Sequence, residues 1–373
     1  MLCKKMPLFL ISIGILAGLA AWEMLAPQKV FSDLENRVLS KLSKPTISTV
    51  YSGQWMRELE TTVADQFPFR AQWIALQALE DAALLRNQRN DILIGRGGWL
   101  FERAANLELR TAQNNIAALN KIAARTQAQV TLMLIPMSSA VYPNALPLGY
   151  SADDQAELLQ ALYGETAGVQ TICLLEDLRA ETTEEPLYFR TDHHWTMAGA
   201  KVAYNALRET WRLPAVDNRQ NVFFSPTGHY GSYYARSPNP LIRPDVFQVA
   251  YPANITLEIE GVPQAGLFDS GAMATQRDKY AQLLYGNHGQ ITLTGSGAKG
   301  VLLVMKDSYA NLLLPWLAQH YQRVEAIDMR YYTGEFEKWI QEQEEEVTIL
   351  CIYGLTTWIS DRNLPRRAAS WED

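Results

Sequence analysis

Cysteine and histidine are scarce in this chain of 373 residues, which has three cysteines and five histidines. Cys3, Cys173 and Cys351 show no Cys-x-x-Cys or other metal spacing, so we expect no cysteine-based metal site. Cys173 and Cys351 lie within apolar runs, where a free buried cysteine is the usual state. A disulfide between these two is the alternative.

Basic runs, internal repeats and low-complexity tracts are also missing from the sequence. The formal net charge is −7, and because phosphate binding requires a basic face, nucleic acid is not an expected partner. Apolar residues make up 48% of the chain, which is enough for a packed core, and the length suggests roughly two domains. The acidic run QEQEEEV, residues 341–347, is typical of a solvated helix end.

One long apolar run is present, at residues 7–22, directly after Lys4 and Lys5. About sixteen apolar residues are many for a signal-peptide core and few for a relaxed membrane span. We expect residues 1–28 to form an uncleaved single-pass anchor in the cell membrane, with the lysines inside and the body extracytoplasmic. The alternatives are secretion after cleavage behind Ala20 and a buried soluble helix.

Residues 29–111 predict a polar linker, two helices and a hairpin. The stretch SGQWMRELETTVADQFPF predicts an amphipathic helix that Pro68 ends. A second helix follows with one apolar face. That face comprises Trp73, Leu76, Leu79 and Ala83. The stretch ILIGRGGWLFER then predicts a strand, a glycine turn and a strand, with Trp99 and Phe101 pointing the same way.

From residue 112 onward helices and strands alternate. The amphipathic stretch NNIAALNKIAART is followed by the apolar strand QVTLMLIP, and VLLVMKDS, RVEAIDM and EVTILCIY are further apolar strands with helices between them. Continuous apolar strands are typical of a sheet covered by helices on both faces. Residues 112–373 therefore predict a three-layer α/β/α sandwich with a mostly parallel sheet, interrupted by a β-rich insertion at about 215–297.

The stretch YFRTDHHWTMAGA, residues 188–200, contains an acid followed by two adjacent histidines. In an extended segment alternate side chains share a face, so Asp192 and His194 are expected on one side and His193 on the other. The Asp192 carboxylate could then accept the His194 N–H and leave the other ring nitrogen free to act as a base. The alternative is a structural polar pair.

A base needs a group to deprotonate, and Ser308 in VLLVMKDSYANLL is the best candidate. It lies where a buried strand ends and a helix begins, which is where sites form in open α/β sheets. Backbone N–H groups and the helix dipole there favour an oxyanion. The alternative is that Ser308 only caps the helix.

Two further interpretations concern His229 and the tyrosines around it. A metal site built on Asp192 would need a distant third ligand such as His229, and no HExxH-like spacing supports such a site. The stretch GHYGSYYAR, which contains Tyr230 and Tyr233, predicts either a rim on which sugars stack or a β-turn with core tyrosines.

Five motifs in the same order resemble the DHHW protein family and, more distantly, the periplasmic alginate O-acetylation proteins of the SGNH hydrolase-like superfamily. The motifs are YFRTDHHWTMAGA, DQFPFR, IGRGGWLF, KDSYANLLLPWL and AIDMRYY. The resemblance runs from about Glu35 to the last strand and implies a triad of Asp192, His194 and Ser308, in an order permuted relative to ordinary SGNH hydrolases. KDSY replaces the usual GDS block, with Lys306 at the place of the turn glycine, and no GxND block is found.

The function implied by this resemblance is an extracytoplasmic O-acetyltransferase or acetylesterase that acts on a cell-surface or secreted polysaccharide without cofactor or metal. A membrane-bound O-acyltransferase is the implied partner. Candidate substrate contacts are Arg190, His193, Trp195, Tyr230, Tyr233 and Lys306. The alternatives are a non-catalytic carbohydrate-binding or scaffold protein and a metal-dependent hydrolase.

Overall fold

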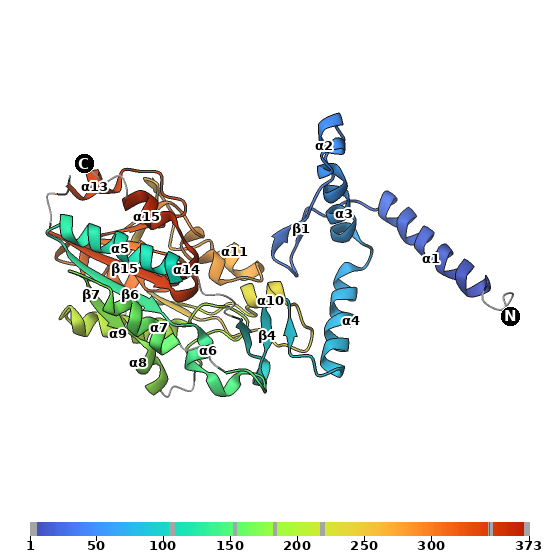
Figure 1. The fold of residues 1–373 in the computed structure, drawn as a ribbon. Coiled ribbons are helices and arrows are strands. Elements are labelled where there is room, and N and C mark those ends of the chain that lie inside the picture. Colours follow the sequence, from blue (N-terminus) through green and yellow to red (C-terminus); the bar gives the residue numbers. More distant parts are fainter. Residues whose placement is uncertain are drawn as a thin grey trace. The chain divides into compact units, whose positions relative to one another are not determined.

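The computed structural model describes residues 6–103, 109–151, 155–181, 185–216, 221–341, 343 and 346–368. The chain divides into two compact units (Figure 1). The first comprises Met1–Arg86 and Tyr234–Ile242, and the second comprises Asn87–Tyr233 and Arg243–Asp373.

The first unit is mainly helical. Its elements are α1 (Met6–Leu25), the pair β1 (Phe31–Ser32) and β2 (Arg37–Val38), α2 (Ile47–Tyr51), α3 (Gln54–Gln66) and α4 (Arg70–Ala83). The predicted break at Pro68 between two helices is confirmed. The predicted apolar face of α4 is exposed, since Trp73, Leu76 and Leu79 remain accessible to solvent.

The predicted membrane anchor receives no support from this structure. Within the described ranges, no helix combines the length and the apolar character that a membrane crossing requires.

An eight-stranded mixed sheet forms the centre of the second unit, in the order β11-β10-β12-β14-β13-β15-β6-β7. The run from β14 to β7 is parallel, and β12, β10 and β11 continue it in antiparallel pairings. The strand bounds are β6 Gln129–Ile135, β7 Gln170–Cys173, β10 Thr256–Ile259, β11 Val262–Pro263, β12 Gln290–Thr294, β13 Lys299–Lys306, β14 Tyr321–Ile327 and β15 Val347–Gly354. The predicted α/β sheet is thus confirmed, but part of the predicted insertion extends it rather than interrupting it.

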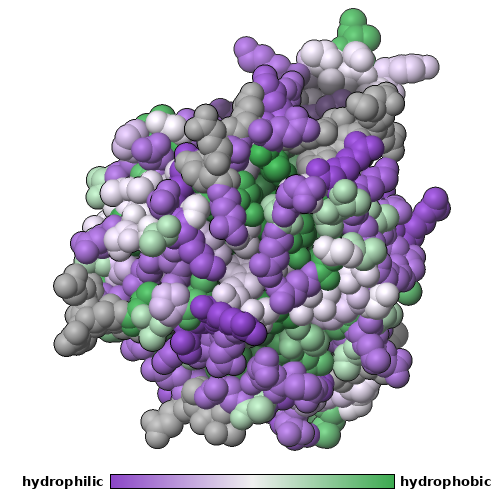
Figure 2. All heavy atoms as spheres, turned by 90° about the vertical axis from the view of Figure 1, so that its left-hand side faces the viewer, coloured by the Kyte–Doolittle hydropathy of each residue, from purple (hydrophilic) through white to green (hydrophobic). Residues whose placement is uncertain are grey.

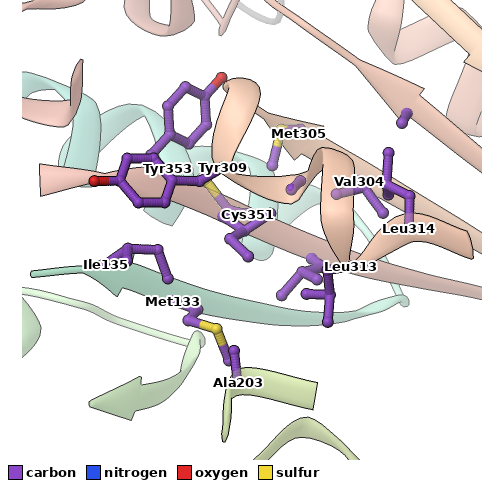
Figure 3. Close-up of a cluster of buried hydrophobic side chains, with 14 of the residues drawn as sticks. Met133, Ile135, Ala203, Val304, Met305, Tyr309, Leu313, Leu314, Cys351 and Tyr353 are labelled. Atoms are coloured by element: carbon purple, nitrogen blue, oxygen red, sulfur yellow. The ribbon is translucent and has the colours of Figure 1, made fainter. Parts of the chain in front are cut away.

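Helices cover this sheet because its central strands are apolar on both faces. Figure 1 shows α5 beside α14 and α15, and α5 contacts both of these helices. Met133 of β6 points toward Ala203 of α9 in the core (Figure 3). The helix bounds are α5 Leu109–Arg125, α6 Ser138–Val141, α7 Gln155–Gly164, α8 Leu175–Ala180, α9 Met197–Thr210, α10 Ser232–Arg236, α11 Ser270–Thr275, α12 Leu314–Leu317, α13 Phe336–Gln341, α14 Leu355–Ser360 and α15 Asn363–Ala368.

Short sheets and 3-10 turns complete the second unit. The predicted hairpin is confirmed as β4 (Ile92–Ile94) and β5 (Leu100–Glu102), joined by η1 (Arg96–Gly98), and the Trp99 and Phe101 rings stack 5.8 Å apart. The remaining elements are β3 (Gln88–Arg89), the pair β8 (Asn221–Phe224) and β9 (Val249–Pro252), η2 (Pro143–Ala145), η4 (Tyr280–Tyr285) and η5 (Ser308–Leu312). The face shown in Figure 2 is mostly hydrophilic, with apolar side chains in a narrow band near its middle.

The two described cysteines are free, so the disulfide alternative is wrong. Cys351 is buried in the core, as predicted, whereas Cys173 is exposed at the end of the edge strand β7. Cys3 lies outside the described residues.

Candidate active site

A tight hairpin positions the segment that contains Asp192 and both histidines. Tyr188 and Trp195 form an isolated antiparallel bridge, and the Phe189 N–H donates to the His194 carbonyl at 3.1 Å. Trp195 is buried, and its Nε1–H donates to the Tyr309 carbonyl at 3.0 Å. The hairpin is thereby attached to the turn that follows β13.

The structure brings Asp192, His194 and Ser308 together. Asp192 Oδ1 lies 2.8 Å from His194 Nδ1, and His194 Nε2 lies 2.7 Å from Ser308 Oγ. Asp192 and His194 are buried. These distances are those of an acid that orients an imidazole and of an imidazole that can accept a hydroxyl proton.

The predicted orientation of His193 is wrong. Its Nδ1 lies 2.9 Å from Asp192 Oδ1, the oxygen that also contacts His194, and the two imidazole rings are 3.7 Å apart. The cause is that residues 190–194 form a bend rather than a strand, so side chains do not alternate between two faces. His193 Nδ1 also lies 2.6 Å from Ser232 Oγ, and its side chain is about a third exposed.

Ser308 does not cap the helix that follows it, because Asp307 does. The Asp307 carboxylate accepts the Tyr309 N–H and the Gly354 N–H, both at 2.9 Å. The Gly354 N–H is therefore engaged and does not serve as an oxyanion donor in this structure. Among the described residues nothing accepts a hydrogen bond from the Ser308 N–H, which leaves that amide available beside the hydroxyl.

Tyr280 connects the base to the turn that carries Ser308, and no pattern in the sequence indicated this role. Its ring stacks on the His194 imidazole with centroids 3.6 Å apart and planes 9° apart. Its hydroxyl donates to the Ser308 carbonyl at 3.0 Å and to the Tyr309 carbonyl at 3.2 Å. The imidazole is therefore fixed from its face as well as from its edges.

The electrostatics of the cluster favour a charged Asp192 beside a neutral His194. Burial raises the pKa of Asp192, but its interactions with His194 and His193, which include a hydrogen bond from each ring, outweigh burial and place this pKa well below its usual range. Burial, followed by the neighbouring His193, lowers the pKa of His194 to about 3 against the pull of Asp192. At neutral pH His194 is therefore a free base.

The predicted substrate contacts fall into two groups. Trp195, Tyr233 and Lys306 are buried, so none of these three presents a surface to a polysaccharide here. Lys306 Nζ donates to Asn311 Oδ1 at 2.6 Å, and burial lowers the pKa of Lys306 to about 8.

Arg190 and Tyr230 are partly exposed, like His193. Arg190 pairs with Asp245 at 3.1 Å, and Tyr230 lies under the Arg277 guanidinium, 4.7 Å from its carbon. A further acid at the site that sequence reasoning missed is Glu102 of β5. Burial raises the pKa of Glu102, and the charge of His193 opposes this rise.

Two groups of side chains have ligand atoms close enough to hold a metal ion. They are Asp192 with His193 and His194, and Asp192 with His229 and Asp278. His193 thus lies within reach of the same position as Asp192 and His194, although the expected alternation of side chains placed it on the other side. His229 is the distant third ligand that the metal alternative named.

Part of this chain is similar in sequence to a known protein family. Residues 92–227 match the family described as SGNH hydrolase-like domain, acetyltransferase AlgX. The predicted SGNH-like resemblance is confirmed. This AlgX-type match includes Asp192 and His194 and ends before Ser308.

The relatives include probable alginate O-acetylase AlgJ of Pseudomonas syringae pv. tomato, which is 29% identical over 206 residues. That match covers 53% of this chain and 50% of AlgJ, so the chain spans about half the length of the curated relative.

Two solved structures share the fold. A DHHW family protein from Eubacterium siraeum superposes with a TM-score of 0.63 at 20% sequence identity. The match covers 76% of this chain and 96% of the DHHW family protein. PatB1 of Bacillus cereus, solved with a sulfonyl adduct, superposes with a TM-score of 0.59 at 21% sequence identity. The match covers 73% of this chain and 97% of PatB1.

Proposed function

We propose that this protein is an O-acetyltransferase or acetylesterase that acts on a polysaccharide through Ser308, His194 and Asp192. The observation that carries the proposal is the continuous contact from Asp192 Oδ1 through the His194 ring to Ser308 Oγ, at 2.8 and 2.7 Å. The AlgX-type match and the name of the AlgJ relatives support O-acetyl transfer as the reaction class.

In the first half of the reaction, Ser308 Oγ attacks the carbonyl carbon of an acetyl ester while its proton passes to His194 Nε2. The Ser308 N–H, which no described residue occupies, can donate to the developing oxyanion. As the ester bond breaks, His194 returns the proton to the departing alcohol oxygen, and Ser308 remains acetylated. Asp192 orients the imidazole and stabilises its charged form.

In the second half, a hydroxyl group attacks the acetyl-serine. His194 removes the proton of that hydroxyl and delivers it to Ser308 Oγ as the acyl bond breaks. A sugar hydroxyl gives acetyl transfer, and water gives hydrolysis. Atoms and charges balance without a cofactor, and no oxidant or reductant is required.

The setting of this reaction is part of the proposal. An extracytoplasmic enzyme cannot draw directly on a cytosolic thioester, so a membrane-bound O-acyltransferase is the proposed source of acetyl groups. The polysaccharide class is inferred from the alginate O-acetylase relatives. Copurification with a polytopic acyltransferase from the native membrane would test this partner.

Hydrolysis of an activated acetyl ester by the full chain tests the chemistry. We expect Ser308→Ala to lower kcat by a factor of about 10³ or more, because loss of a triad nucleophile has effects of this size or larger. Ser360→Ala is the matched control, since Ser360 is exposed on α14 and, as far as the described residues go, its hydroxyl bonds only to carbonyls of its own helix. Equal rates for wild type and Ser308→Ala would refute the assignment and favour a non-catalytic or metal-dependent role.

A further inference from the structure

His229 is a fully buried histidine that the proposed triad does not use. Its backbone exchanges two hydrogen bonds with that of Asp245: the His229 N–H donates to the Asp245 carbonyl at 3.1 Å, and the Asp245 N–H donates to the His229 carbonyl at 2.9 Å. Its ring packs on Phe189 and Phe247, with centroids 4.7 and 5.3 Å away. The imidazole therefore has a defined position beside the hairpin of residues 188–195.

One hydrogen bond determines which ring nitrogen carries the proton. The Lys279 backbone N–H donates to His229 Nδ1 at 3.1 Å. A backbone N–H can only donate, so Nδ1 must offer a lone pair, and the proton of the neutral ring lies on Nε2. That Nε2 is buried without a hydrogen-bond partner and lies 3.5 Å from Asp192 Oδ2.

The second oxygen of Asp192 needs such a donor. Oδ1 contacts both His193 and His194, whereas the one hydrogen bond that Oδ2 accepts within the described part of the chain comes from the Ser232 N–H, at 3.2 Å. Catalytic hydrogen bonds are often long in unliganded enzymes and shorten in the reacting complex. A 3.5 Å separation between a buried N–H and a buried carboxylate fits such a contact.

We propose that His229 is a positioning residue for the reaction inferred above. Its Nε2–H, directed by the Lys279 amide, holds the Asp192 carboxylate in the plane that orients His194. This inference rests on the proposed function, but the proton position on His229 can be measured without it.

The same cluster could instead hold a metal ion on Asp192, His229 and Asp278. Coordination through His229 Nε2 requires a lone pair there and hence a proton on Nδ1, which would face the Lys279 N–H. Burial lowers the pKa of His229, but Asp192, whose Oδ2 lies 3.5 Å from Nε2, and the charges of Asp278 and Asp245 outweigh it and raise this pKa. They favour a proton on Nε2, not a free lone pair.

Nitrogen-15 NMR of the histidine-labelled full chain tests the proton position. We expect, at a pH where His229 is neutral, a protonated Nε2 and an unprotonated Nδ1, with the signal assigned by its loss in His229→Phe. A protonated Nδ1, or stoichiometric bound metal in elemental analysis together with an unprotonated Nε2, would overturn the inference.

Two substitutions separate positioning from packing. His229→Phe keeps a ring against Phe189 and Phe247 but removes the N–H, whereas His229→Gln can keep an N–H donor and removes the ring. We expect kcat to fall about tenfold to a hundredfold in His229→Phe with little change in KM, since misplacement by about 1 Å can cost 10²-fold. His229→Gln should recover part of kcat.

The matched control is His320→Phe, because His320 is a buried histidine that bonds to Tyr204 rather than to the triad. Full activity in His229→Phe, or a higher kcat in His229→Phe than in His229→Gln, would show that the ring acts by packing alone and would refute the proposal. The proposed function fails separately, if Ser308→Ala retains activity.

Discussion

A methyl group added at Gly231 would collide with the residue that orients the base. An ideal Cβ at this position lies 1.9 Å from Asp192 Oδ2 and 2.3 Å from Asp192 Cβ. Ordinary contact begins at 3.4 Å, so relief requires the carboxylate to move by about 1.5 Å. Rotation of the carboxylate alone is insufficient, because Asp192 Cβ is also too close.

Such a movement would break the 2.8 Å contact between Asp192 and His194. Misplacement of a catalytic group by about 1 Å can cost 10²-fold, and loss of the correct orienting carboxylate costs up to about 10⁴-fold. We therefore expect Gly231→Ala to lower kcat for acetyl ester hydrolysis by a factor of about 10² to 10⁴. Overpacking should also lower the free energy of unfolding by about 1–3 kcal/mol.

The assay compares Gly231→Ala with Gly164→Ala, because a Cβ at Gly164 meets nothing within 4 Å. Circular dichroism and urea unfolding establish that both variants are folded at the assay temperature. Wild-type kcat in a folded Gly231→Ala protein would refute the reasoning, since it would mean that the position of Asp192 does not matter for the reaction.

Three other variables should respond in defined directions. Because burial lowers the pKa of His194 to about 3, kcat/KM should stay level as the pH falls through 6.5, and an acid limb at 6.5 would contradict this. Burial lowers the pKa of Lys306 from 10.5 to about 8, so between these pH values the unfolded chain binds a proton that the folded chain does not, and the free energy of unfolding should rise with pH. The free energy of unfolding of the wild type minus that of Lys306→Met, measured in urea, should therefore increase from pH 8 to pH 10.5. A difference that does not change with pH would contradict this. Trp195→Phe should cost about 1 kcal/mol in urea unfolding through loss of the bond to the Tyr309 carbonyl, and an unchanged midpoint would contradict that.

The central sheet was predictable because its parallel strands are apolar on both faces. β6, β13 and β15 are continuous buried runs, which is the strongest strand signal a sequence offers. β10 and β12 are short and only partly buried, so their membership of the same sheet could not be inferred. The helix α4 was predicted correctly, but its periodicity does not reveal that the apolar face lacks cover within the described chain.

At the site, the resemblance to the DHHW family implied that Asp192 and His194 meet Ser308. The pattern alone indicated only that Ser308 follows a buried strand, which is where sites form in open α/β sheets. The orientation of His193 could not be predicted, because it depends on the bend at residues 190–194, which no residue pattern indicates. Tyr280 and His229 approach from irregular segments, where side-chain direction follows from tertiary contacts rather than from periodicity.

The central claim is that Ser308 is a nucleophile activated by His194. Rapid-quench mass spectrometry of the full chain with an activated acetyl ester, followed by peptide mapping, tests it most directly. The account predicts one acetyl group on Ser308 in the wild-type protein and none in His194→Ala over the same interval. Turnover with an unmodified Ser308, or with the acetyl group on another residue, would contradict it.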